Sequence, residues 1–158
     1  MKKVNVIGGG LAGSECAFLL ATHGVEVHLY EQKPVRYSPA HKSENFGELV
    51  CSNSLKSDDA SANACGLLKE EMRRLGSLCL EAADKFAVPA GGALAVERNG
   101  FSEYITQKIK NHPNITVKAE EVTAVPEGPV IIATGPLTSD AMSEAIGKYF
   151  GQTGYLHF

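Results

Sequence analysis

The first thirty residues follow the pattern of a strand, a helix and a second strand. Residues 3–7 (KVNVI) are rich in β-branched side chains, which predicts a short strand. Residues 11–23 predict a helix that Gly24 ends, and residues 25–30 (VEVHLY) alternate apolar and polar positions as a second strand. Such a βαβ unit is the element from which parallel sheets are built.

The pattern changes at residue 32. Residues 32–60 carry Pro, Ser, Asn and Asp with no hydrophobic period, which predicts an extended loop. From about residue 62 to about residue 87, apolar positions recur at the spacing of a helix, and Gly76 predicts a break within it.

The remaining pattern completes an α/β order of elements. It predicts short strands at residues 93–96, 115–118 and 130–133 and helices at residues 101–110 and 139–148. This order is typical of a doubly wound parallel sheet, the fold of a Rossmann-like FAD/NAD(P)-binding domain. We expect residues 1–158 to be the N-terminal part of such a domain. Because the sheet is then incomplete, we also expect the chain to self-associate through it.

Composition excludes several classes of protein. The chain has 158 residues, 44% of them hydrophobic, and a net charge of −3, which argues against nucleic-acid binding by the whole surface but not by a local basic patch. No run approaches the roughly 18 apolar residues of a membrane span. The four cysteines form no CxxC pair, so we expect no metal site, no disulfide framework and a cytoplasmic location.

Between the first strand and the first helix lies the motif G-x-G-x-x-G, formed by Gly8, Gly10 and Gly13. Its glycines permit a tight turn, let the backbone approach a pyrophosphate and let the helix pack closely. Glu31 ends the second strand, where a carboxylate accepts hydrogen bonds from a ribose and repels a 2′-phosphate, which disfavours NADP. The predicted cofactor-binding residues here are Gly8, Gly9, Gly10, Leu11, Ala12, Gly13 and Glu31. The alternative is a turn that is merely rich in glycine.

A second motif favours FAD over NAD. Residues 130–135 (VIIATG) resemble the second fingerprint of flavoproteins with two dinucleotide-binding domains. This resemblance implies that Thr134 and Gly135 also bind the cofactor.

Four longer strings identify a family. They are FGELVCSNSLKS (46–57), GLLKEEMRRL (66–75), VPAGGALAVERNGFS (88–102) and VIIATGPLTS (130–139). Together they resemble the folate- and FAD-dependent tRNA (uracil-5-)-methyltransferases, which are related to the glucose-inhibited-division-type tRNA-modifying flavoproteins. The resemblance implies that methylenetetrahydrofolate donates a methylene to a T-loop uridine of tRNA, that reduced FAD turns it into the methyl of 5-methyluridine, and that NAD(P)H reloads the flavin.

Within this resemblance, Cys51 matches a cysteine that the family places beside the flavin. Family members are much longer than this chain, and their second functional cysteine has no counterpart in it. The chain is therefore expected to be a fragment or a truncated product. The alternative function is a non-catalytic module that binds FAD or a partner.

Cys51 suits two steps of this chemistry. Its thiolate could add to carbon 6 of uracil and so activate carbon 5, or it could move the carbon-5 proton. A nearby cation would favour the thiolate, and Lys56 is the nearest basic residue in sequence. Asn53 and Ser54 are predicted to hydrogen-bond the flavin or pyrophosphate. The alternatives are a buried Cys51 and loop-capping roles for the other two residues.

Other candidates have weaker support. Cys16, Cys65 and Cys79 have no partner at metal-ligand spacing and are expected to pack in the core. His41 lies in the cofactor loop, where it could contact a ligand or face solvent. Lys69, Arg73 and Arg74 form a basic helix face that could meet tRNA phosphates, although a solvated face is the more common case.

Overall fold

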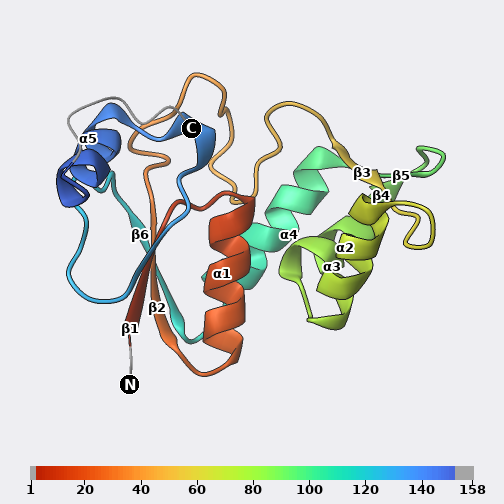
Figure 1. The fold of residues 1–158 in the computed structure, drawn as a ribbon, viewed down its shortest axis with the longest axis horizontal. Coiled ribbons are helices and arrows are strands. Elements are labelled where there is room, and N and C mark those ends of the chain that lie inside the picture. Colours follow the sequence, from red (N-terminus) through yellow and green to blue (C-terminus); the bar gives the residue numbers. More distant parts are fainter. Residues whose placement is uncertain (1–2, 152–158) are drawn as a thin grey trace.

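The computed structural model describes residues 3–151 and contains a four-stranded parallel sheet (Figure 1). The strands are β1 (Lys3–Ile7), β2 (Glu26–Glu31), β6 (Ile115–Ala119) and β7 (Val130–Ile132), in the order β6-β2-β1-β7. Every neighbouring pair is parallel, with β2 beside β1 from Lys3↔Glu26 onward. The predicted α/β class and parallel sheet are confirmed. Residues 1–2 and 152–158 of the expected domain lie outside the described residues.

The helices that pack on this sheet are α1 (Leu11–Thr22), α4 (Arg98–Lys110) and α5 (Asp140–Tyr149). Helices α2 (Ala64–Arg74) and α3 (Leu78–Lys85) lie to one side of it (Figure 1). The predicted break at Gly76 is confirmed, because this residue has φ +76° and separates α2 from α3. Helix α4 begins earlier than expected because the Glu97 carboxylate caps it, accepting from the N–H groups of Asn99 and Gly100.

A second, antiparallel sheet lies beside this layered unit. It consists of β3 (Ser54–Ser57), β5 (Ala93–Val96) and β4 (Ala87–Val88), in the order β3-β5-β4. The segment 32–60, expected to be a loop, therefore contains one strand. With the sequence SLKS, this strand offers a single apolar side chain, so backbone pairing with β5 sets its structure and no hydrophobic alternation reveals it.

The core has two parts because successive strand residues point to opposite faces of the sheet. On one face, Val6 and Leu29 pack in the large cluster that also contains Phe101 of α4 and Leu78 of α3. On the other face, Ile7 packs against Met142 and Ile146 of α5. Both faces thus carry helices, as a doubly wound sheet requires.

Within residues 3–151, no helix has both the length and the apolar character needed to cross a membrane.

Candidate functional site

A cavity of about 260 Å³ opens at the carboxyl ends of β1, β2 and β7. Its walls are the turn after β1, the end of β2 and residues 133–139 after β7, together with His41, Val50 and residues 120–122. Strand β1 has β2 on one side and β7 on the other, so the chain order reverses at this point of the sheet. Open parallel sheets bind ligands at this kind of position.

The three motif glycines have different roles: Gly8 and Gly10 line the cavity, whereas Gly13 does not line it and lies against the Gly8 carbonyl. Gly8 has φ +104°, and a Cβ there would lie 2.5 Å from the Ala133 carbonyl oxygen. A Cβ at Gly13 would lie 1.8 Å from the Gly8 carbonyl oxygen. A Cβ at Gly10 would meet no atom within 4 Å. The fold therefore requires glycine at positions 8 and 13, whereas at Gly10 the space is left open beside the cavity.

The N-terminus of α1 faces the same cavity, because Gly10, Leu11 and Ala12 all line it. Gly10 is the N-cap, no side chain caps the helix, and its first turn carries no acidic residue. The first N–H groups and the positive end of the helix dipole are thus available to an anion. This arrangement fits the pyrophosphate of a dinucleotide.

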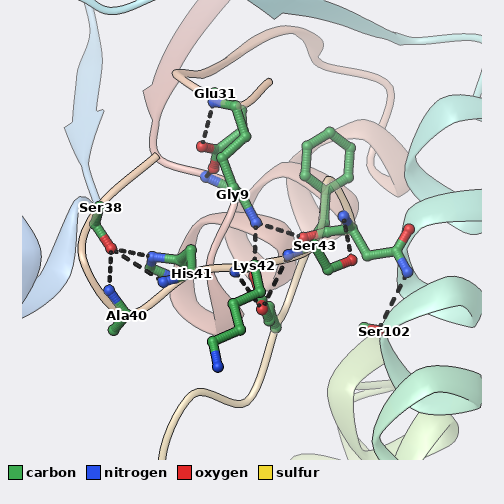
Figure 2. Close-up of polar contacts among 12 residues, drawn as sticks. Gly9, Glu31, Ser38, Ala40, His41, Lys42, Ser43 and Ser102 are labelled. Atoms are coloured by element: carbon green, nitrogen blue, oxygen red, sulfur yellow. Dashed lines mark hydrogen bonds and ion pairs between the residues drawn. The ribbon is translucent and has the colours of Figure 1, made fainter. Parts of the chain in front are cut away.

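The Glu31 carboxylate is buried and fixed at the edge of the glycine turn (Figure 2). Its Oε2 accepts a hydrogen bond from the Gly9 N–H at 2.7 Å, and its Oε1 accepts from the Lys33 N–H at 3.0 Å. A carboxylate has about four acceptor sites, so two remain for a ligand hydroxyl. Glu31 is therefore preorganised for the ribose role predicted for it.

The second fingerprint forms the opposite wall. Strand β7 is tied to β1 by the Ala133 N–H, which donates to the Ile7 carbonyl at 2.8 Å. Gly135 then turns the chain at φ +66°, and the Thr138 hydroxyl donates to its carbonyl at 2.7 Å. Thr134 and Gly135 both line the cavity. The two predicted fingerprints, more than a hundred residues apart in sequence, thus meet at one site.

The segment after β2 contributes His41 to the cavity wall. His41 Nδ1 lies 2.6 Å from the Ser38 hydroxyl (Figure 2). The Glu48 carboxylate fastens the segment by accepting from the N–H groups of Lys42 and Ser43 and pairing with the buried Lys33 ammonium at 3.4 Å. Burial alone would raise the pKa of Glu48, but these hydrogen bonds and the Lys33 charge outweigh it and lower that pKa.

Cys51 is exposed and follows Val50, which lines the cavity. The alternative of a buried cysteine is therefore wrong. The basic residue bound to this segment is Arg98, whose Nη2 donates to the Cys51 carbonyl at 2.8 Å. Arg98 and Glu48 have structural roles that sequence reasoning missed. Both lie in strings that indicated the family, but nothing in the local pattern distinguishes them from solvated charges.

Asn53 and Ser54 lie in the antiparallel sheet and do not line the cavity. The Asn53 amide donates to the Val96 carbonyl at 2.9 Å, and the Val96 N–H donates to the Asn53 carbonyl at 3.0 Å. Ser54 pairs with Ala95. Through these contacts, Asn53 and Ser54 attach the segment that contains Cys51 to β5. Contact of either residue with the cofactor stays a prediction.

The remaining cysteines divide by location. Cys79 is buried as expected, and its burial raises the pKa of its thiol, while Cys16 is half-buried. The expectation for Cys65 is wrong, because it lies exposed on the first turn of α2, where Asn63 caps its N–H. Within residues 3–151, no group of three or more His, Cys, Asp and Glu side chains is arranged to hold a metal ion.

The basic face of α2 is occupied by internal contacts. Lys69 is buried, and its ammonium donates to the carbonyls of Ser57 and Cys65. Arg73 binds the carboxylates of Asp58 and Asp84, and Arg74 pairs with Glu70 on the same helix. These contacts favour a structural role over phosphate binding.

Comparison with known proteins agrees with this geometry. A family model described as glucose inhibited division protein A matches residues 3–155. A relative from Exiguobacterium sibiricum is 58% identical over 158 residues, and one from Enterococcus faecalis is 59% identical over 157 residues. Both are named methylenetetrahydrofolate–tRNA-(uracil-5-)-methyltransferase TrmFO. The chain spans 36% of the length of each of these relatives.

A solved structure shows the same fold. The chain resembles GidA of Aquifex aeolicus with a TM-score of 0.63 and 21% identity, over 80% of this chain and 21% of that one.

Proposed function

Since the chain belongs to the glucose inhibited division protein A family, we propose that it is the FAD-binding N-terminal part of a tRNA methyltransferase. The proposed reaction is the methylation of a T-loop uridine to 5-methyluridine, with methylenetetrahydrofolate as the carbon donor and NAD(P)H as the reductant. Two relatives that match almost the whole chain carry the name of this activity. The substrates tRNA and folate would bind the complete protein.

One structural observation carries the proposal: two motifs distant in sequence line one cavity suited to a dinucleotide. The open space at Gly10 and the uncapped N-terminus of α1 would take the pyrophosphate. Glu31 would hold the ribose, and its negative charge opposes a 2′-phosphate. Thr134 and Gly135 would close the site from the β7 side. When bound there, FAD supplies the electrons that convert the transferred methylene into a methyl group.

We propose that Cys51 activates the uracil ring for methylation. Cys51 is exposed and directly follows Val50, which lines the cavity, although Cys51 itself is not a lining residue. A tRNA base could therefore reach its thiol without rearrangement of the core. Two roles fit this position. The thiolate can add to carbon 6, which makes carbon 5 nucleophilic, or it can remove the proton from carbon 5.

The alternative function is a module that binds FAD or a partner without catalysis. The two functions differ in one requirement: only the enzyme needs a reactive thiol at Cys51.

The test is Cys51→Ala in the full-length protein, with Cys65→Ala as the matched control because that cysteine is also exposed. We expect Cys51→Ala to retain flavin and to be reduced by NAD(P)H at the parental rate, since hydride transfer to flavin needs no thiol. Labelled methyl incorporation into tRNA should fall by about 100-fold or more. Parental methylation would refute the catalytic role, and joint loss of flavin and methylation would make Cys51 part of the cofactor pocket.

A further inference from the structure

We propose that Arg98 is a positioning residue for Cys51: its guanidinium fixes the backbone of the exposed cysteine next to Val50, a residue that lines the cavity. This inference rests on the proposed function, because it assigns Arg98 to the step that Cys51 performs. Sequence reasoning pointed to Lys56 as the basic residue nearest to the cysteine. The structure instead joins Arg98, 47 residues away, to the cysteine's own backbone.

The contact is a fork across two carbonyl groups. Nη1 of Arg98 donates to the Leu49 carbonyl at 2.9 Å, and Nη2 donates to the Cys51 carbonyl at 2.8 Å. Both distances lie in the ordinary range of N–H···O bonds, and the donor is charged, which strengthens them. Because a guanidinium is planar, the two bonds together fix the distance and the orientation of the carbonyls. The residue between them, Val50, lines the cavity.

The backbone that carries Arg98 is firmly held in the fold. Arg98 is the first residue of α4, and Glu97 caps that helix. The Glu97 N–H donates to the Phe86 carbonyl at 2.8 Å, and the neighbouring Val96 side chain is fully buried. Phe101, one turn further along the helix, is also fully buried. Movement of Arg98 Cα would therefore require movement of the core.

The same stretch of backbone, residues 96–98, also holds the other end of the Cys51 segment, at Asn53. Val96 exchanges two hydrogen bonds with Asn53, which follows Cys51 by two residues. Residues 49, 51 and 53 are thus each bonded to the stretch 96–98. Arg98 supplies two of these three attachments, so its removal should release the thiol-bearing residue while Asn53 stays paired.

Arg98 and the carbonyls that it binds lie at the surface. Loss of its bonds exposes these carbonyls to water and leaves no buried group unsatisfied, so global stability should change little. A positioning role therefore predicts local loosening and slower methyl transfer, whereas a purely structural role predicts loss of stability and flavin. These outcomes can be separated.

The first test measures local order without catalysis. In full-length, flavin-loaded protein in which every cysteine except Cys51 is replaced by alanine, a nitroxide label is attached to Cys51. Its spectrum is compared between this parent, Arg98→Gln and Lys148→Gln. The last variant is a charge-matched control, because Lys148 is an exposed residue of α5. We expect Arg98→Gln to shorten the rotational correlation time of the label by about twofold or more, on the nanosecond scale of loop motion. The control should match the parent.

The second test measures the reaction with unlabelled protein. We expect Arg98→Gln to lower kcat for methyl transfer by about tenfold or more, because small displacements of reacting groups are costly, with an unchanged KM for tRNA. Flavin content and the rate of flavin reduction should remain parental. Arg98→Lys should recover part of kcat, since one ammonium can bond one carbonyl but cannot form the fork.

Three results would overturn the inference: an unchanged label in Arg98→Gln, a loosened label with parental kcat, or loss of flavin and stability in that variant. Failure of the proposed function itself has a different signature. In that case Cys51→Ala would methylate tRNA at the parental rate, whatever the Arg98 variants do.

Discussion

At the scale of single residues, the sequence predicted most of the residues that meet at the cavity, because the requirements of a glycine turn are steric and local; that they bind a cofactor stays a prediction. The motif glycines and Glu31 follow from their spacing within one βαβ unit, and the structure places Gly8, Gly10 and Glu31 on the cavity wall. The surroundings of Cys51 could not be predicted in the same way. The Arg98 and Asn53 side chains hold its segment by donating hydrogen bonds to backbone carbonyls. Because every residue has a backbone carbonyl, the sequence does not indicate which ones are bonded.

Gly10→Val separates cofactor binding from folding. The new side chain would project into space free of protein atoms beside the cavity, so the fold should persist while the pyrophosphate is blocked. We expect the full-length variant to purify with flavin reduced at least about tenfold, since close backbone approach to the pyrophosphate is what this glycine permits. The measurements are flavin absorbance per protein and circular dichroism.

Gly13→Ala is the matched control for this experiment. Its Cβ would lie 1.8 Å from the Gly8 carbonyl oxygen, so it should disturb the fold together with flavin binding. Parental flavin content in Gly10→Val would show that the glycine turn is not the binding site.

At the scale of elements, hydrophobic period predicted those strands and helices whose apolar faces meet the core. The parallel strands and α1 belong to this group, whereas the break between α2 and α3 was predicted from Gly76. Strand β3 and the segment 38–51 could not be predicted, because contacts distant in sequence determine them. Ser54–Ser57 pairs with Ala93–Val96. The Glu48 carboxylate holds its segment by accepting hydrogen bonds from two backbone N–H groups and by forming an ion pair with the Lys33 ammonium.

The Glu48 contacts predict a dependence of stability on pH. The folded state lowers the pKa of this carboxyl, so its contribution to stability is present above the unfolded pKa, about 4.3 for a free Glu. That contribution is lost as pH falls through the lower, folded value. Glu48→Gln should reduce the free energy of unfolding at pH 7 by about 1–2 kcal/mol, since Lys33 keeps its bond to the Asn45 carbonyl.

Urea unfolding of the parent and Glu48→Gln at several pH values measures this. The difference between the two should shrink as pH falls below about 4, where the parental carboxylate becomes protonated. A difference that stays constant from neutral to acidic pH would mean that the pair contributes nothing through its charge. The exposed Glu103 offers a control substitution, Glu103→Gln, which should change stability by less than about 0.5 kcal/mol.

At the scale of the whole molecule, the cavity lies where the sheet order reverses, and β7 forms one border of both the cavity and the sheet. In residues 129–133, the odd-numbered residues form the hydrogen bonds to β1. The Pro129 carbonyl accepts from the Asn5 N–H, and the Ala133 N–H donates to the Ile7 carbonyl. The backbone groups of Val130 and Ile132 therefore point to the outer edge, which pairs with no other strand among residues 3–151. Ile132, on this edge strand, also exposes 36% of its surface.

This edge makes self-association of the 158-residue chain testable. Unpaired parallel strands with apolar side chains recruit further strands, so we expect light scattering to show dimers or larger species as concentration rises. Ile132→Lys places a charge at the edge without touching the bonds to β1, and should shift the chain toward the monomer. Leu19→Lys, which replaces an exposed apolar residue of α1, should not. A parental chain that stays monomeric at high concentration would refute edge pairing, and equal effects of both lysines would assign any association to general surface hydrophobicity.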